Sequence, residues 1–437
     1  MAYSYEELPS GMTAVFGHEK HFQTSSAHLV FKAGSLHESD SAPPGVAHFL
    51  EHTPFQGTRS FPTLDRFNNF VKSDGSDYNA YTAPTTTGYT ADGLRLDNIL
   101  KTVFELGFHP LLTKKGLEND RNAVIEEARA EQFHPYRQEI EAYHTLFGGV
   151  KYARLITGNV EDIEQITRGD ILSFFKSHYH PSNAHLVVCS SEPIREQRKI
   201  ANMLASQIDT SRYHKPQIPE RLQLHWLMQE DLVHAHHNQV DDDEAQSGIS
   251  MGFHVDTPKT FEDYILTELA TSMLDWRVFH RVREKSNLAY GATTSLTAIE
   301  NLDNGMTDDN YYALEIHTTM IGENIQRGLD VIMAARDGVE KDVSSAEIAL
   351  RIAERKLRGS IEASPKTATE SINESAQVFY HDVYDPKAHQ VILNSMSNEE
   401  IRKKALVLLS NLKLISLAGP NDKQLQAARI HASSLKN

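Results

Sequence analysis

The same order of predicted elements occurs twice along the chain, and this repeat limits the possible folds more than any other feature of the sequence. The first half contains a strand-like stretch, a helical stretch, a β-rich stretch and two helices at 25–34, 45–55, 76–91, 94–108 and 114–132. The second half contains a strand, a helix, a strand and two helices at 246–255, 261–284, 311–319, 322–338 and 344–363. An apolar sheet face must be covered by another layer. The repeat therefore predicts an α+β fold of two homologous α/β-roll halves, each with a sheet covered by helices.

The length of the chain agrees with this duplication. A chain of 437 residues is longer than a single hydrophobic core usually supports. The segment 213–222 contains two prolines among polar residues, which is typical of a linker. We therefore predict an N-terminal domain at 1–215 and a C-terminal domain at 216–437.

The chain is expected to be cytoplasmic. It contains no run of ~18 apolar residues, which a membrane-spanning helix would need. Its first residues lack the basic and apolar regions of a secretory signal. Its one cysteine, Cys189, excludes an intrachain disulfide framework and suits a reducing compartment. Because Cys189 stands in an apolar, strand-like run, we predict a buried structural thiol.

The balance of charges argues against nucleic acid as a partner. The chain has 43 Lys and Arg residues against 59 Asp and Glu residues, which gives a formal net charge of −16. Nucleic-acid binding depends on neutralising phosphates with Lys and Arg side chains. We therefore expect no nucleic-acid partner.

One short stretch carries residues suited to metal chemistry. The sequence "GVAHFLEHTPFQGT" at 45–58 contains His48, Glu51 and His52. Residues three and four apart lie on one face of a helix, so both imidazoles can reach one cation while Glu51 holds a water beside it. The order H-x-x-E-H is a zinc-peptidase signature. The alternative is a polar helix face, since the chain has 23 histidines.

A third ligand would have to come from another element. Zinc suits two imidazoles and one carboxylate, with a fourth position open. The charged stretch "ENDRNAVIEEARAE" offers Asp120 and Glu127, which share a helix face, and Glu126, which is rotated away by one position. Spacing alone does not choose among these acids, because charge-rich helices usually present a solvated face. In the second half, "ILTELATSM" occupies the place that corresponds to "HFLEHTPF" in the first half. Only the first half is therefore predicted to hold a metal.

These stretches together resemble the pitrilysin, or M16, family of zinc metallopeptidases, also called inverzincins. The resemblance rests on "GVAHFLEHTPFQGT", "DYNAYTAPTTTGYTA", "DRNAVIEEARAE" and, in the second half, "REKSNLAYG". The resemblance covers nearly the whole chain, and these stretches occur in the same order as in the family. It implies the short two-domain type, similar to bacterial members that are like the mitochondrial processing peptidase. The implied activity is that of a zinc-dependent endopeptidase with one Zn²⁺ per chain.

The resemblance also implies roles for residues around the metal. His48, His52 and Glu127 are implied as the metal ligands, and Asp120 as the acid behind them. Glu51 is implied as the catalytic base. Asp120 is one methylene shorter than the glutamate that is commoner at its place. Pro54 comes two residues after His52, so we expect the metal helix to end or kink there.

Further residues are implied to bind the substrate. Arg283 and Tyr290 match an Arg/Tyr pair that contacts the substrate and stabilises the developing oxyanion. Asn79, Ala80 and Tyr81 match an edge strand to which an extended peptide adds through its main chain. In the family the two halves face each other as a clam shell around a chamber. We therefore expect peptides or unfolded polypeptide segments as substrates.

The assembly and one alternative function complete these expectations. Chains of this length usually pair, and this one carries both the metal residues and the Arg/Tyr pair, so a homodimer is favoured. The alternative is a non-catalytic peptide-binding or assembly subunit. Such subunits usually lack a ligand, whereas His48, Glu51, His52 and Glu127 are all present.

Overall fold

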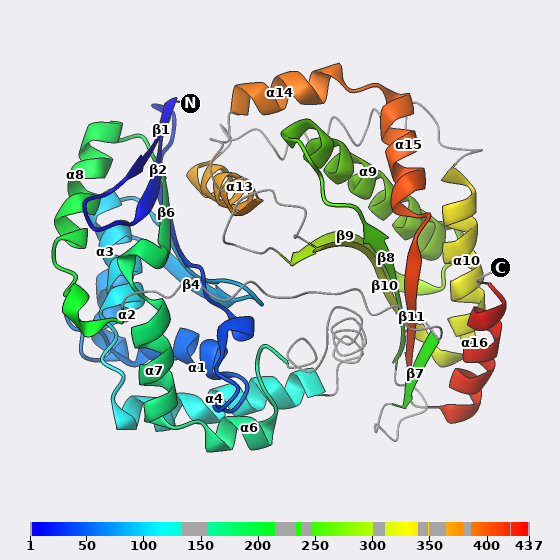
Figure 1. Cartoon of the computed structure of the whole chain (residues 1–437), viewed down its shortest axis with the longest axis horizontal. Helices are drawn as coiled ribbons and strands as arrows, with labels where there is room; N and C mark the ends of the chain where they lie inside the picture. Colours follow the sequence, from blue (N-terminus) through cyan, green and yellow to red (C-terminus); the bar gives the residue numbers. More distant parts are fainter. Residues whose placement is uncertain are drawn as a thin grey trace. The chain divides into compact units, whose positions relative to one another are not determined.

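The computed structural model describes residues 2–132, 155–214, 233–237, 246–299, 311–339, 348, 364–378, 386–419 and 421–435. These residues form two compact units (Figure 1). The first unit contains 2–129, 155–214 and 364–378, and the second contains the other described residues. This division departs from the predicted boundary between 215 and 216 at two described segments. Residues 130–132, which the prediction assigns to the N-terminal domain, belong to the second unit. Residues 364–378, which the prediction assigns to the C-terminal domain, belong to the first unit.

The first unit is built on a six-stranded sheet with the order β1-β2-β6-β3-β5-β4. The strands are β1 (Ala2–Glu7), β2 (Thr13–His18), β3 (Ser25–Phe31), β4 (Asp77–Thr82), β5 (Thr87–Gly93) and β6 (Ala184–Ser190). The β2–β6 pair is parallel and the other neighbours are antiparallel. The predicted strand stretches therefore form β3, β4 and β5, and β4 lies at an edge of the sheet.

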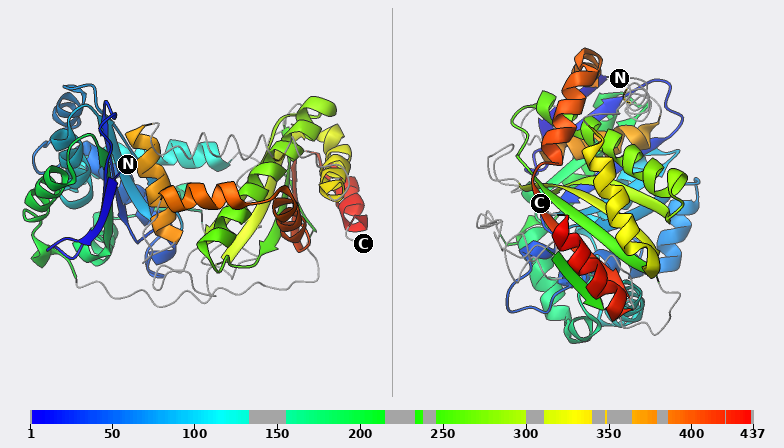
Figure 2. Two further views of the ribbon diagram at one scale, coloured as in Figure 1. Left: turned by 90° about the horizontal axis from the view of Figure 1, so that it is seen from above. Right: turned by 90° about the vertical axis from the view of Figure 1, so that its right-hand side faces the viewer.

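Helices cover the faces of this sheet. They are α1 (Val46–His52), α2 (Leu64–Lys72), α3 (Leu96–Phe108), α4 (Lys114–Gln132), α6 (Val160–Gln165), α7 (Arg168–His178), α8 (Ile194–Ala205) and α13 (Pro365–Val378). Figures 1 and 2 show α3 and α8 on one face and α13 on the other. Helix α13 contacts β3 and β6, and both Thr369 on this helix and Cys189 on β6 are buried. This packing explains why α13 belongs to the first unit.

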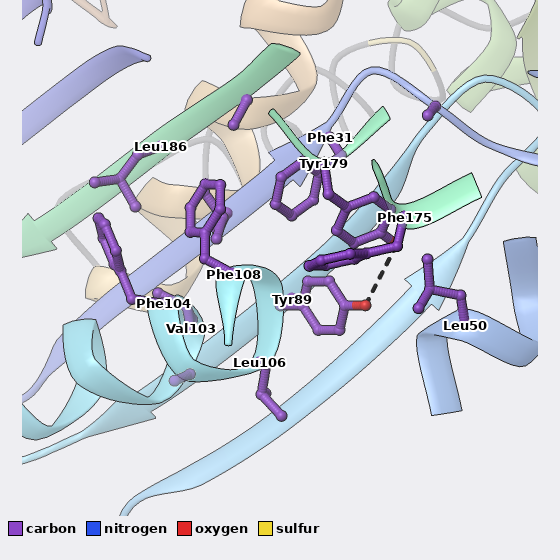
Figure 3. Packing of buried hydrophobic residues seen from close by; sticks show 14 of the residues in the cluster. Phe31, Leu50, Tyr89, Val103, Phe104, Leu106, Phe108, Phe175, Tyr179 and Leu186 are labelled. Carbon is purple, nitrogen blue, oxygen red and sulfur yellow. Dashed lines mark hydrogen bonds between the residues drawn. The ribbon is translucent and has the colours of Figure 1, made fainter. Parts of the chain in front are cut away.

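Aromatic side chains fill the layer between the sheet and its helices (Figure 3). The Phe31 ring stacks on the Tyr179 ring with a centroid distance of 4.1 Å. The Tyr89 and Tyr179 hydroxyls lie 3.4 Å apart and share a hydrogen bond, so neither buried phenol is left unsatisfied. Phe108 and Leu50, from α3 and α1, belong to the same buried cluster. Helix α1 is therefore held against a closely packed core.

The second unit has a five-stranded sheet with the order β7-β11-β8-β10-β9. Its strands are β7 (Val233–His237), β8 (Gln246–Val255), β9 (Ala289–Ile299), β10 (Tyr311–Ile321) and β11 (Leu412–Gly419). Its helices are α9 (Phe261–Phe279), α10 (Ile325–Asp337), α14 (Pro386–Ser395), α15 (Asn398–Leu408) and α16 (Asp422–Ser434). A π-helical turn, His280–Lys285, completes the predicted helix 261–284. The predicted helix 344–363 lies outside the described residues except for its residue 348.

The two units confirm the predicted fold class, since each is a sheet covered by helices. Among the residues that the structure describes, no helix combines the length and apolar character needed to cross a membrane.

Candidate metal centre

Helix α1 begins where the backbone makes a close turn. Its N-cap, Gly45, has a φ of 94°, and a Cβ there would lie 2.5 Å from the carbonyl oxygen of Thr157. Glycine suits both the left-handed conformation and the close approach. The buried Glu38 carboxylate accepts the backbone N–H groups of Gly45 and Ala47, at 3.2 and 2.8 Å. A carboxylate at this end satisfies free donors of the first turn and so fixes where the helix starts.

The end of α1 follows from Pro54. The α-helix stops at His52, and a 3₁₀ turn, Thr53–Gln56, continues the chain. Proline has no N–H to continue the α-helical bonding pattern. The expected end just after the second histidine is therefore confirmed.

The two histidines of α1 and one glutamate of α4 point to a common centre. The Nε2 atoms of His48 and His52 lie 3.2 Å apart. Glu127 Oε1 lies 3.7 Å from His48 Nε2, and Glu127 Oε2 lies 3.4 Å from His52 Nε2. Atoms bound about 2.0–2.2 Å from one tetrahedral ion are separated by about 3.3–3.6 Å. The three side chains therefore fit a zinc ion both in chemistry and in spacing.

The geometry also distinguishes the three acids that the sequence leaves open. Glu127 alone among them joins the two histidines in the donor group. Glu126 is exposed and pairs with Arg129 on its own helix. Asp120 is buried, and its Oδ1 accepts a 2.6 Å hydrogen bond from Gln56 Nε2. Asp120 therefore lies behind the donor group rather than in it.

The charges of the side chains in and around the donor group shift one another's pKa values. Hydrogen bonds from His48 and His52 hold the Glu127 pKa well below its usual value. Burial disfavours the charged form of His52, but the hydrogen bond to Glu127 and the nearby Glu51 and Asp120 charges outweigh it and raise the His52 pKa. Burial raises the Asp120 pKa to about 6. A site that attracts positive charge in this way is suited to a cation.

Glu51 stands beside the donor group without joining it. Its side chain is 7% exposed, and its Oε2 accepts a 2.7 Å hydrogen bond from Thr82 Oγ1 at the end of β4. Thr82 is the last residue of the predicted substrate strand, and the sequence predicts no contact between it and Glu51. The hydrogen bond joins residues of two separate elements, β4 and α1, so the spacing of residues along the chain does not indicate it.

The predicted substrate strand is an edge strand in the structure. Asn79 is exposed, and Ala80 packs against the core of the unit. The Tyr81 ring lies edge-on to the His28 ring, with a centroid distance of 5.5 Å. Gly88 on β5 makes this contact possible, because a Cβ there would lie 2.3 Å from the Tyr81 ring. Among the strands that the structure describes, β4 pairs with β5 alone, so it has the edge position that strand addition needs.

Arg283 and Tyr290 lie together in the second unit. The Arg283 guanidinium lies 4.5 Å from the Tyr290 ring centroid and 5.3 Å from the Phe279 ring centroid. Tyr290 is 84% exposed. The predicted pair is therefore in contact, and Phe279 is an additional member. The spacing of four between Phe279 and Arg283 on a helix is a signal that could have identified it.

Comparison with known proteins places the chain in a family. The model described as Insulinase (Peptidase family M16) matches residues 14–145. The model described as Peptidase M16 inactive domain matches residues 165–354. The first match contains the candidate metal ligands, and the second contains Arg283 and Tyr290. Together the two matched ranges take in most of the chain.

Individual relatives agree with these matches. An uncharacterized zinc protease of Rickettsia bellii is 22% identical over 295 residues, which are 66% of this chain and 68% of that protein. An uncharacterized zinc protease of Streptomyces coelicolor is 28% identical over 204 residues, 46% of this chain and 41% of that protein. The match to the Streptomyces protein thus spans less than half of its length.

A solved structure shares the fold. The crystal structure of a peptidase M16 inactive domain from Pseudomonas fluorescens has a TM-score of 0.78 and 16% identity to this chain. The match covers 96% of this chain and 99% of that one. From the two family models and these likenesses, we conclude that the chain belongs to peptidase family M16.

Proposed function

We propose that this protein is a zinc-dependent endopeptidase that hydrolyses peptides or unfolded polypeptide segments. The observation that carries the proposal is the convergence of His48, His52 and Glu127, with the Glu51 carboxylate beside them. His48, His52 and Glu127 would hold the ion. A zinc ion, when bound in such a site, supplies a Lewis acid that makes water more acidic.

The chain's own residues would perform the proton transfers. Glu51 takes a proton from the attacking water and then gives a proton to the leaving amine. Its burial at 7% exposure suits a base that works in a site shielded from bulk water. Asp120, which lies behind the donor group, would hold the side chains around His52 in place.

The substrate would bind in extended form. Main-chain groups of Asn79, Ala80 and Tyr81 would pair with the peptide along the edge strand β4, which favours extended segments of varied sequence. The Tyr290 hydroxyl would donate a hydrogen bond to the developing oxyanion, and Arg283 would hold the substrate or the tyrosine ring. We also propose a closed chamber and a homodimer, because the chain carries both the metal residues and the Arg/Tyr pair.

A non-catalytic peptide-binding subunit is the competing function. Glu51, which such a role does not need, is present and is buried beside the donor group. Hydrolysis of an unstructured fluorogenic peptide by the purified protein separates the two functions. We expect cleavage that a chelator abolishes and added zinc restores. Zinc binding without cleavage would support the non-catalytic role.

A further inference from the structure

We propose that Thr82 is a positioning residue for Glu51. Its hydroxyl would hold the carboxylate of the base in place and so connect the edge strand β4 to the metal helix α1. This inference rests on the proposed function, because it assigns Thr82 a part in the same reaction.

The contact between the two residues is direct. Thr82 Oγ1 donates to Glu51 Oε2 at 2.7 Å. The alternation of a strand puts Tyr78, Ala80 and Thr82 on one face of β4, and Tyr78 and Ala80 pack against the core of the unit. Helix α1 packs on β4. The Thr82 hydroxyl therefore points to the helix that carries Glu51.

Glu51 needs such a partner for a physical reason. The last side-chain torsion of glutamate has a broad energy minimum, so packing of the carbon chain does not by itself fix the carboxylate plane. Hydrogen bonds to charged groups are about twice as strong as neutral ones. A base must also lie within hydrogen-bond reach of the proton that it takes. The Thr82 hydroxyl restricts the orientation on which that reach depends.

The backbone that carries Thr82 is itself held in place. The turn after β4 receives backbone hydrogen bonds from Ser35 N to Ala83 O, at 3.3 Å, and from Leu36 N to Pro84 O, at 2.9 Å. A Cβ at Gly34 would lie 2.0 Å from Ala83 O, so only glycine allows this approach. The hairpin is thus fastened to the segment that precedes α1. Thr82 is therefore a fixed point from which Glu51 can be oriented.

A functional consequence follows for β4. The strand would bind the peptide through its edge and hold the base through its last side chain. The register of the bound peptide and the position of the base would then be set by a single rigid element. Positioning by one element keeps the peptide and the base within the narrow range of distances and orientations that catalysis requires.

The first test compares Thr82→Val with Thr82→Ser. Valine keeps the branched shape without the hydroxyl, and serine keeps the hydroxyl. For Thr82→Val we expect kcat to fall roughly 10- to 100-fold, the rate equivalent of one hydrogen bond to a charged group. KM and zinc content should stay near the wild-type values, and Thr82→Ser should recover most of kcat. Thr13→Val is the matched control, since Thr13 is half-buried in the same sheet and bonds His185 instead.

Two outcomes of this test would overturn the proposal. A Thr82→Val protein with wild-type kcat would show that the hydroxyl has no part in positioning Glu51. Equal losses in Thr82→Val and Thr82→Ser would assign the effect to packing of β4.

The second test does not depend on activity. Glu51→Met keeps the chain length without an acceptor oxygen. Urea unfolding of wild type, Thr82→Val, Glu51→Met and the double variant measures the coupling between the two residues. We expect the double variant to lose less stability than the sum of the single losses, whereas additive losses would contradict the contact. If the wild type cleaves no peptide, the proposed function fails, while this cycle still decides whether Thr82 holds Glu51.

Discussion

His52 Nε2 lies 3.4 Å from Glu127 Oε2, although the two residues stand on different helices, α1 and α4. His48 Nε2 lies 3.7 Å from the other oxygen of the same carboxylate. The glutamate therefore closes a triangle of donor atoms that α1 alone leaves incomplete.

The first prediction concerns the third ligand. Glu127→Gln should lose most of its zinc, because an amide is a far weaker zinc ligand than a carboxylate, whereas wild type should hold about one zinc per chain. Glu126→Gln is the matched control, since Glu126 is the exposed neighbour that pairs with Arg129. Elemental analysis of purified protein gives the ratio of zinc to protein. A full zinc content in Glu127→Gln would remove Glu127 from the ligand set.

The second prediction separates the base from the ligands. Glu51→Gln should keep its zinc, because Glu51 stands outside the donor triangle. Its kcat on a peptide substrate should fall by ~10²–10⁴, the usual worth of general-base catalysis. Steady-state kinetics and elemental analysis of the same preparation check both points. Near-normal turnover would assign the base to a different group.

The third prediction concerns the second unit. Tyr290→Phe removes the hydroxyl but keeps the ring over which the Arg283 guanidinium lies. If the hydroxyl stabilises the oxyanion, kcat should fall by ~10²–10³ while KM changes much less. Arg283→Ala should lower kcat and raise KM if the guanidinium also binds the substrate. Equal kcat values for wild type and Tyr290→Phe would exclude the hydroxyl from the reaction.

The fourth prediction concerns the buried thiol beneath α13. Burial raises the Cys189 pKa to about 12 from an ordinary value of 9.0. The folded protein thus keeps the thiol protonated where the unfolded chain ionises, so its contribution to stability is complete below pH 9.0 and decreases as the pH rises toward about 12. The stability advantage of wild type over Cys189→Ala should shrink over that range in urea unfolding. A constant difference would show that the thiol does not titrate on unfolding.

A labelling experiment provides a second measure of the same thiol. Only the thiolate reacts readily with thiol reagents. Cys189 should therefore resist labelling near neutral pH in native protein and react at once in urea. Rapid labelling of the native protein would show that the thiol is reached without unfolding.

Local spacing was enough to predict several features of this protein. His48, Glu51 and His52 share a face of one helix because the repeat of an α-helix is set by its backbone. The end of α1 beyond His52 follows from the missing N–H of Pro54. The α+β class follows from the repeated order of strand and helix patterns. Each of these depends on residues that are neighbours along the chain.

Only the tertiary structure decided the contacts between distant elements. Along α4, Asp120 and Glu127 share a face, and the packing of α4 against α1 determines which acid reaches the histidines. Helix α13 follows the predicted boundary in sequence, yet it covers the first sheet because β3 and β6 present the face on which it packs. Thr82 reaches Glu51 because β4 lies beside α1. The sequence alone therefore determined the local geometry of the metal motif, whereas packing between elements, which depends on the whole core, completed the site.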